Sequence, residues 1–434
     1  MDIYVVEPGD TLLSIAQRNG ISAELLALEN GLSPEDSLLI GQALLIARPE
    51  LSYTVQPGDS LNGIAESQGV SLRQLWRYNP WLSAGCGLYP GQSVILQYQE
   101  SGSPISESPV SERREFFVNG YAYPYLSREI LGQALACLNT LSLFAYGFTE
   151  QGALVRPNSS QLADWARAAQ VGTMMVLAPL DENGQFNNEQ ISRVLNDLAK
   201  RQRLIQEIMA ELSAEALAGV DLDFEYIKKE DSQSYIDFAA ALQKELSSRG
   251  MRLTVALAPK LYAEQPGLLY EGHDYGALGA IADHVTLMTY EWGYTYGPPM
   301  AVSPLPQVRR VAEYGVSEIE PGKILLGMSN YGYDWTLPYE QGRPARSIGN
   351  QQALDIARRY GAEIVFDEYS QVPYFSYRNE EGVEHVVWFE DVRSISARMA
   401  LAADLGLGGL SYWTVMRPFM QNWLYLALAY TITP

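Results

Sequence analysis

The run Gly219-Val220-Asp221-Leu222-Asp223-Phe224-Glu225 alternates carboxylates with apolar side chains. Successive side chains of a β-strand point to opposite faces, so this period of two predicts a strand with Asp221, Asp223 and Glu225 on one face. Crowded acids repel each other and lose solvation on burial, which raises their pKa values. A carboxyl group that keeps its proton near neutral pH can act as a general acid. The alternative is a solvated edge strand, but the apolar residues 217–220 lead into the motif and favour a buried strand.

Strand-like and helix-like stretches alternate from Glu115 onward, which favours a repeated βα fold over a β-sandwich. We expect eight strands, at residues 116–118, 140–146, 173–178, 219–225, 252–258, 284–290, 324–328 and 409–413. Eight such strands match a (β/α)8 TIM barrel, in which functional groups lie at the C-terminal strand ends. Glu225, Tyr290 and Trp413 fall at such ends. The long connection after the seventh strand, at about residues 336–391, predicts a small α+β insertion that forms one wall of a cleft.

Two copies of one unit open the chain. Tyr4-Val5-Val6-Glu7-Pro8-Gly9-Asp10 matches Tyr53-Thr54-Val55-Gln56-Pro57-Gly58-Asp59, and the match runs on to Gly41-Gln42 against Gly91-Gln92. Each copy predicts a strand, two helices and a strand, so we assign residues 1–48 and 49–98 to two small βααβ modules. Asp10 or Thr11, and Asp59 or Ser60, can cap the first helix of each unit.

Residues 99–113 are rich in Ser, Glu and Pro, which predicts a linker. We expect this linker to let the modules take several angles relative to the large domain, residues 114–434.

The composition of the chain limits the kinds of binding partner that it can have. The formal net charge is −21, from 51 acidic and 30 basic residues, which argues against nucleic acid or an anionic membrane as the main partner. The longest late apolar stretch is far shorter than a membrane span, so we expect no membrane insertion. The first residues lack a basic and apolar leader, so we expect no signal peptide and synthesis in the cytoplasm. Cys86 and Cys137 do not suggest a disulfide framework, and His273, His284 and His385 lack metal-type spacing. No metal and no cofactor is implied.

The two repeats resemble LysM modules, which are small βααβ domains. The resemblance implies binding of N-acetylglucosamine polymers such as peptidoglycan or chitin, in a groove between the loop after the first strand and the loop before the last strand. The implied contacts are Gly9, Asp10, Thr11, Leu38, Leu39 and Ile40 in the first module, and Gly58, Asp59, Ser60, Leu88, Tyr89 and Pro90 in the second. Part of this pattern also serves as core and turn scaffold whatever the ligand is.

The carboxylate strand is similar to the signature of glycoside hydrolase family 18, Asp-Gly-x-Asp-x-Asp-x-Glu. Ala218 replaces the first Asp, while the three later acids are intact. Met288-Thr289-Tyr290-Glu291 resembles the family's Met-x-Tyr-Asp, with Glu291 in place of Asp. Trp413 matches the tryptophan on the eighth strand that forms the floor of the family's site.

Further segments narrow the resemblance. Tyr290-Glu291-Trp292-Gly293, Asn330-Tyr331-Gly332-Tyr333-Asp334-Trp335 and Trp388-Phe389-Glu390-Asp391 are similar to the SleL/YaaH group of spore cortex-lytic N-acetylglucosaminidases. That group also carries two N-terminal LysM modules and lacks a signal peptide. The resemblance implies action on spore cortex peptidoglycan during germination, assembly onto the spore coat or cortex, and coat proteins as possible partners.

Asp223 and Glu225 approach a sugar from one side, which suits retaining hydrolysis assisted by the substrate's own 2-acetamido group. By resemblance, Glu225 protonates the leaving oxygen and then activates water, and neighbouring charge, chiefly that of Asp223, keeps its proton in place. Asp223 holds the acetamido N–H, Asp221 shares charge or a proton with Asp223, and Tyr290 donates to the acetamido oxygen. The implied substrate-binding residues are Trp413, Glu291, Met288, Trp292, Asp334 and Trp335, with Tyr294 a weaker candidate.

Two other functions remain open. A chitinase of the same fold would use the same catalytic residues, because both polymers carry the acetamido group. A peptidoglycan enzyme needs a cleft with room for lactyl or lactam substituents on alternate sugars. The second alternative is a glycan-binding spore-coat protein built on an inactive barrel, and an intact Glu225 argues against it.

Overall fold

The computed structural model describes residues 1–83, 87–99, 113–157, 160–181 and 183–432. Cys86 and residues 100–112 of the expected linker lie outside the described residues. Cys137 is buried, and its Sγ lies 3.7 Å from the carbonyl oxygen of Trp423.

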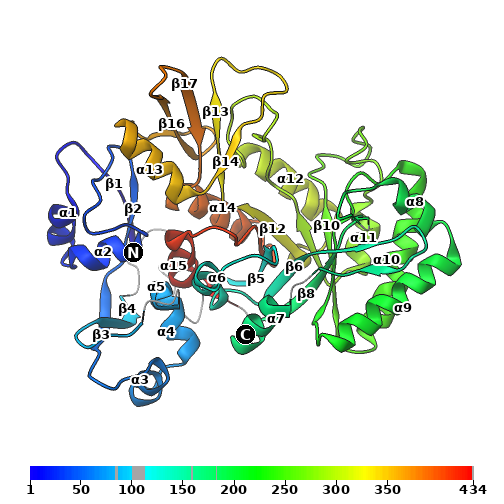
Figure 1. Ribbon diagram of the computed structural model, residues 1–434, viewed down its shortest axis with the longest axis horizontal. Helices are drawn as coiled ribbons and strands as arrows, with labels where there is room; N and C mark the ends of the chain where they lie inside the picture. Colours follow the sequence, from blue (N-terminus) through cyan, green and yellow to red (C-terminus); the bar gives the residue numbers. More distant parts are fainter. Residues whose placement is uncertain (84–86, 100–112, 158–159, 182, 433–434) are drawn as a thin grey trace.

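Eight parallel strands close into a barrel at the centre of the large domain (Figure 1). The strands follow one another around the barrel in chain order, and the last pairs with the first to close the ring. They are β5 (Glu115–Ala122), β6 (Thr140–Phe148), β8 (Gly172–Leu177), β9 (Gly219–Leu222), β10 (Arg252–Leu257), β11 (His284–Leu287), β12 (Ile324–Ser329) and β18 (Gly409–Trp413). The TIM-barrel prediction is therefore confirmed.

Strand β9 is shorter than expected, since it ends at Leu222 instead of reaching Glu225. Its neighbour β8 ends at Leu177, so only one further ladder bond forms, from the Asp223 N–H to the Leu177 carbonyl at 3.0 Å. The alternation nevertheless continues beyond the strand. Phe224 is fully buried on the helix side of the barrel wall, and its ring stacks between Phe148 and Tyr235.

Helices surround the barrel, and most of them have one apolar face. In α10 (Ser232–Ser247) the buried side chains Tyr235, Phe238, Leu242 and Leu246 recur at helical spacing and pack on the barrel. The other long helices are α6 (Arg128–Leu135), α7 (Ser160–Ala168), α9 (Leu198–Ala214), α12 (Leu305–Glu318), α14 (Val392–Asp404) and α15 (Met420–Ala429). The shorter helices are α8 (Glu189–Leu195) and α11 (Tyr275–Ile281).

A five-stranded antiparallel sheet with one helix follows β12, which confirms the expected α+β insertion after the seventh strand. It stands beside the mouth of the barrel (Figure 1). Its elements are β13 (Gly332–Thr336), β14 (Arg346–Ile348), α13 (Asn350–Tyr360), β15 (Val365–Asp367), β16 (Val372–Arg378) and β17 (Glu384–Trp388). The sheet begins with β13, before the expected start of the insertion at residue 336.

The two repeats fold as βααβ units, as expected. The first contains β1 (Asp2–Val5), α1 (Leu12–Asn19), α2 (Ala23–Glu29) and β2 (Ala43–Ile46). The second contains β3 (Pro49–Thr54), α3 (Leu61–Gln68), α4 (Leu72–Tyr78), the additional short helix α5 (Pro80–Ser83) and β4 (Ser93–Tyr98).

Equivalent residues have the same structural roles in both units. Thr11 and Ser60 are the N-caps of α1 and α3, each accepting from the backbone N–H three residues later. Asn30 and Asn79 each join the second helix to the last strand, with three side-chain hydrogen bonds of 2.7–2.9 Å.

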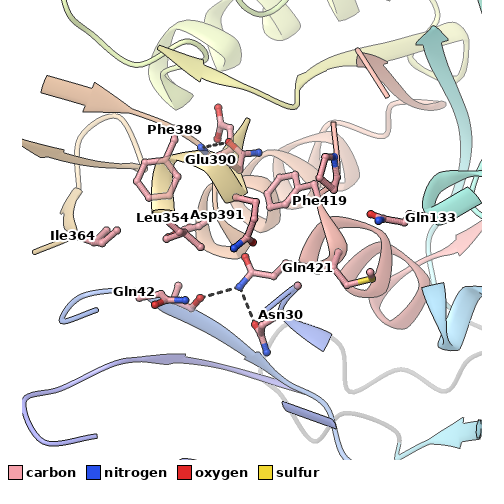
Figure 2. A pocket seen from close by; sticks show the side chains of 16 residues that line it. Asn30, Gln42, Gln133, Leu354, Ile364, Phe389, Glu390, Asp391, Phe419 and Gln421 are labelled. Carbon is pink, nitrogen blue, oxygen red and sulfur yellow. Dashed lines mark hydrogen bonds between the residues drawn. The ribbon is translucent and has the colours of Figure 1, made fainter. Parts of the chain in front are cut away.

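Both modules pack directly on the large domain, module one beside α13 and α15 and module two beside α15 and α6 (Figure 1). In module one, the Gln421 Nε2 on α15 donates to Asn30 Oδ1 at 2.8 Å and to the Ala43 carbonyl at 2.9 Å, at the edge of a cavity of about 190 Å³ (Figure 2). In module two, Arg73 and Arg77 donate to the Ala136 carbonyl after α6, at 3.1 and 2.8 Å. The expectation that the modules take several angles is therefore wrong, because these contacts, buried at Gln421 and part-buried at Arg73 and Arg77, hold them in one arrangement.

Candidate active site

The first acid of the motif lies inside the barrel. Asp221 is fully buried in β9 and accepts a hydrogen bond from Ser142 Oγ on β6 at 2.8 Å. Burial raises the pKa of Asp221 to about 6, while hydrogen bonding opposes a further rise. Asp221 Oδ1 has no hydrogen-bond partner among the described residues, so this carboxyl has capacity to share a proton with its neighbours.

Asp223 and Glu225 follow at the C-terminal end of β9. Asp223 is buried, and its pKa is raised by burial and then by the charges of Glu225 and Asp221. Burial also raises the pKa of the half-buried Glu225, with the charge of Glu291 as the next cause. The sequence analysis expected the charge of Asp223 to be the chief cause of proton retention on Glu225. In the structure, burial is the largest cause and the charge of Glu291 is the next. Within the described structure, Asp223 Oδ1 is buried without a hydrogen-bond partner.

The loop after β11 brings in Tyr290 and Glu291. Tyr290 is half-buried, and burial together with the surrounding acids raises the pKa of its hydroxyl, so the group stays a proton donor. Glu291 accepts hydrogen bonds from the hydroxyls of Tyr331 and Tyr333. Its backbone is left-handed at φ 66°, as is that of Tyr226 at φ 55°, directly after Glu225. Such conformations cost free energy and concentrate at functional sites.

Trp413 ends β18 and lies across the barrel mouth from the acids. Its ring packs edge-on against Tyr121 and Phe144, with centroids 5.4 and 5.0 Å away, and lies nearly parallel to Tyr290 at 6.5 Å. The indole lines an open cleft of about 350 Å³. Other side chains of this cleft are those of Tyr123, Tyr125, Glu291, Ser347, Met416 and Arg417.

Other predicted contacts of the barrel lie beside the cleft or in its walls. Met288 is buried against Tyr270 and Tyr290, and Trp292 is half-buried at the edge of the main core. Tyr294 is exposed over 43% of its surface, near Tyr226.

Asp334 and Trp335 do not reach the cleft. Asp334 is buried on the far face of β13, where it pairs with His385 and accepts from the Tyr377 hydroxyl, both at 2.8 Å. Trp335 points to the opposite face but is only 2% exposed, and its indole N–H donates to the Gly297 carbonyl at 2.9 Å. Both predicted sugar contacts are corrected to structural roles in the insertion, because each polar group already has a protein partner.

The predicted glycan contacts of the modules belong in part to the turn scaffold. Asp10 accepts from the Tyr4 hydroxyl at 2.6 Å, and Asp59 accepts from the Tyr53 hydroxyl at 2.9 Å. Thr11 and Ser60 cap helices, so all four predicted side chains stabilise the turn, and their contacts with a glycan stay predictions. Of the remaining predicted residues, Gly9, Gly58 and Pro90 are exposed and Leu38 and Leu88 are half-buried.

The second loop differs sharply between the modules. Tyr89 of module two is 52% exposed, while Leu39, its equivalent in module one, is 8% exposed and packs in the core of the insertion. The neighbouring Ile40 is 40% exposed, but its carbonyl accepts from the Ile364 N–H at 2.9 Å. One wall of the expected groove in module one is therefore covered by the insertion.

The sequence analysis did not identify three features of the site. His273 is buried between the Ala258 N–H and the Phe224 carbonyl, at 3.0 and 2.9 Å, and so fixes the backbone between Asp223 and Glu225. Burial lowers the pKa of His273 to about 4, so it is neutral. Tyr123 and Arg417 were missed because no local pattern marks them as part of the cleft.

The described part of the chain contains no cluster of three His, Cys, Asp or Glu side chains arranged as metal ligands. Nor does any helix within the described ranges have the length and apolar character to cross a membrane.

The chain is similar to known proteins in both sequence and structure. The model of glycosyl hydrolases family 18 matches residues 144–417, and that of the LysM domain matches residues 4–47 and 53–97. The cortical fragment-lytic enzyme of Bacillus subtilis (strain 168) is 36% identical over 434 residues, 98% of this chain and 97% of the relative. The crystal structure of the spore cortex-lytic enzyme SleL of Bacillus cereus matches with a TM-score of 0.82 at 34% identity, over 100% of this chain and 98% of that one. SleL of Bacillus megaterium QM B1551 matches with a TM-score of 0.82 at 35% identity, over 99% of this chain and 98% of that one.

Proposed function

Because the chain belongs to family 18 of the glycosyl hydrolases, we propose that it is a β-N-acetylglucosaminidase that cleaves spore cortex peptidoglycan. The observation that carries the proposal is the convergence of Asp223, Glu225, Tyr290 and Trp413 at the barrel mouth. An aromatic floor binds the apolar face of a sugar, and the carboxyl groups supply acid–base chemistry. The names of the full-length relatives direct the proposal to cortex rather than to another polymer.

In the proposed mechanism, N-acetylglucosamine stacks on Trp413 with its acetamido group toward Asp223 and Tyr290. The buried, unpartnered Asp223 Oδ1 accepts the acetamido N–H, and the Tyr290 hydroxyl donates to the acetamido oxygen. That oxygen attacks C1 while Glu225 gives its proton to the departing glycosidic oxygen, which leaves as an alcohol.

The second step restores Glu225. The intermediate is a cyclic oxazolinium ion, whose positive charge is stabilised by Asp223 and the proton-sharing Asp221. Glu225, now a carboxylate, removes a proton from water as the water oxygen attacks C1 and the ring opens. Two displacements at C1 return the sugar with retained configuration.

We assign substrate retention on insoluble murein to the modules, residues 1–48 and 49–98, and hydrolysis to residues 114–434, with residues 99–113 as the linker. The match of two LysM domains supports binding of N-acetylglucosamine polymers. A weak binding site fixed near a catalytic cleft raises the local substrate concentration without adding contacts at the reacting bond. A place on the spore coat or cortex, with coat proteins as neighbours, fits this role.

A chitinase is the competing activity, since the acetamido chemistry is the same for both polymers. The two are separated by incubating the wild-type protein with purified cortex and with N-acetylglucosamine oligomers, using Glu225→Gln as the inactive control. Faster release of soluble fragments from cortex supports the proposal. Release from the oligomers alone would indicate that the protein is a chitinase. Release from neither substrate would indicate that the barrel is a glycan-binding protein without hydrolytic activity.

A further inference from the structure

Arg417 is an unpaired cation in the cleft of an acidic protein. It lines the same cavity as Trp413 and Tyr125, and its Nη2 donates to Ser347 Oγ at 3.1 Å. Within the described structure it makes no ion pair with an acid, and its Nη1 is buried without a partner. A guanidinium has five N–H donors in a planar fork that matches a carboxylate, so most of its binding capacity is unused.

The surrounding residues do not compensate this charge. Glu291 lines the same cavity, but its carboxylate is engaged by the hydroxyls of Tyr331 and Tyr333. Burial lowers the pKa of Arg417, because desolvation disfavours the charged form of its guanidinium. Arg417 is therefore a half-buried cation that faces the cleft without a counter-ion among the described residues. A bound substrate can supply that anion.

Peptidoglycan alternates N-acetylglucosamine with muramyl sugars, and this alternation indicates which substrate group supplies the anion. If N-acetylglucosamine stacks on Trp413, the sugar next to it is a muramyl residue, which carries a lactyl substituent that chitin lacks. Tyr123 stacks on Tyr125 with centroids 5.6 Å apart and lies 6.1 Å from Trp413, so an aromatic surface leads from the reacting sugar past Arg417. We propose that Arg417 binds a carboxylate carried by this muramyl substituent and thereby selects peptidoglycan over chitin.

This inference rests on the proposed function, and it names the group that recognises the substrate. The carboxylate has two possible sources: the lactyl group itself, or the end of a short peptide attached to it. Both present the same planar anion to the guanidinium. A δ-lactam, in which the lactyl carboxyl is closed into an amide, removes that anion while the sugar chain stays the same.

The test uses the full chain with Glu225→Gln, which removes turnover and leaves the cleft in place. Calorimetry measures the Kd for four tetrasaccharides: one with free lactyl carboxylates, one with alanyl-lactyl groups, one with δ-lactams, and N-acetylglucosamine tetramer. Arg417→Gln should raise the Kd for one or both anionic ligands about tenfold or more, and leave the two neutral ligands unchanged. The ligand affected identifies the source of the carboxylate. Arg417→Lys should retain part of the affinity, because it keeps the charge without the fork.

Arg346→Gln is the matched control. Arg346 is exposed on the neighbouring strand β14 and does not line the cavity, so removing its charge should leave all four Kd values unchanged. Equal weakening of all four ligands by Arg417→Gln would overturn the inference, and so would unchanged binding of the anionic ones. Hydrolysis of cortex by the wild-type protein tests the proposed function separately, so the two failures are distinguishable.

The unequal loops of the two modules support a second inference. In module one, Leu39 is buried in the core of the insertion, and the Arg393 side chain donates to the Gly41 carbonyl at 3.2 Å. An added Cβ on Gly41 would meet the Ile364 carbonyl oxygen at 1.9 Å, whereas one on Gly91 would meet nothing within 4 Å. The geometry points to module two as the glycan-binding module and to module one as a docking element of the insertion.

Hydrogen exchange of the Glu225→Gln chain, with and without N-acetylglucosamine tetramer, tests this assignment. Ligand should slow exchange in residues 56–62 and 87–92 and leave residues 37–42 unchanged. Tyr89→Ala should remove the slowing in module two, while Leu13→Ala, at a similarly exposed apolar side chain of module one, should not. Ligand-dependent slowing in residues 37–42 as large as in module two would overturn the assignment.

Discussion

Comparing Gly41→Ala with Gly91→Ala, its equivalent in module two, distinguishes the effect of docking module one from the strain that alanine causes in either turn. Gly41 has φ 82° and Gly91 has φ 89°, so an alanine at either position pays the penalty of the left-handed region. Only at Gly41 does the new methyl group also collide with backbone, 1.9 Å from the Ile364 carbonyl oxygen. That oxygen cannot rotate away as a side chain would, so module one and the insertion must separate.

The magnitudes follow from the contacts that separation breaks. The left-handed penalty is about 1–2 kcal/mol in both variants. At Gly41 the overpacking adds about 1–3 kcal/mol. Loss of the Ile364 N–H to Ile40 carbonyl bond, which is 2.9 Å long, adds about 1 kcal/mol. We therefore expect Gly41→Ala to cost about 2–4 kcal/mol more than Gly91→Ala.

Urea unfolding compares the two variants, and hydrogen exchange of β15 locates the change. Gly41→Ala should accelerate exchange at Ile364 and in β15, whose register with β16 lies beside the contact. Gly91→Ala should leave β15 as in the wild type. Equal destabilisation by both variants, with unchanged exchange in β15, would refute the docking of module one on the insertion.

Three further predictions concern titratable groups. Glu225→Gln should lower kcat by about 10²–10⁴-fold while largely preserving the Kd for glycan, measured by calorimetry, because it removes the proton donor but not the cleft; near-wild-type turnover would exclude Glu225 as the acid. Asp223→Asn should lower kcat by about 10²–10³-fold on the same substrate through loss of charge at the acetamido group, and unchanged kcat would remove that role. Burial raises the pKa of Glu29, which accepts from the Tyr98 hydroxyl at 2.9 Å between the modules, to about 8 from its usual 4.5. The folded state holds this proton more tightly, so the stability it contributes is fully present below about pH 4.5 and lost as pH rises through about 8. Thermal unfolding of Glu29→Gln between pH 5 and 9 should therefore show a flatter profile than that of the wild type, and parallel profiles would contradict this account.

Local pattern was sufficient to predict the barrel. Strands such as residues 409–413 are short apolar runs between amphipathic helices, and the observed β18 has the predicted bounds. The period of two around Asp221 also predicted correctly that this acid points away from Leu222 and Phe224, both of which are buried in the wall of the barrel.

The errors came from contacts between distant segments. Asp334 and Trp335 resembled site residues in sequence, but partners 38 to 51 residues away hold both of them in the insertion. The composition of residues 99–113 indicated a linker, while the docking of the modules depends on Gln421, Arg73 and Arg77 acting across the fold. Arg417 carries no local signal, because its place in the cleft beside Trp413 and Tyr125 depends on segments that lie far apart in the sequence.

The reducing ends of the fragments released from purified cortex test the central claim most directly. Borohydride reduction of the soluble products, followed by mass spectrometry, distinguishes reduced N-acetylglucosamine from reduced muramic acid at each chain end. The account predicts reduced N-acetylglucosamine, because the reacting sugar is the one that stacks on Trp413 and contributes its acetamido group. Fragments that end in reduced muramic acid would contradict it, since the bond cleaved would then be on the other side of the disaccharide.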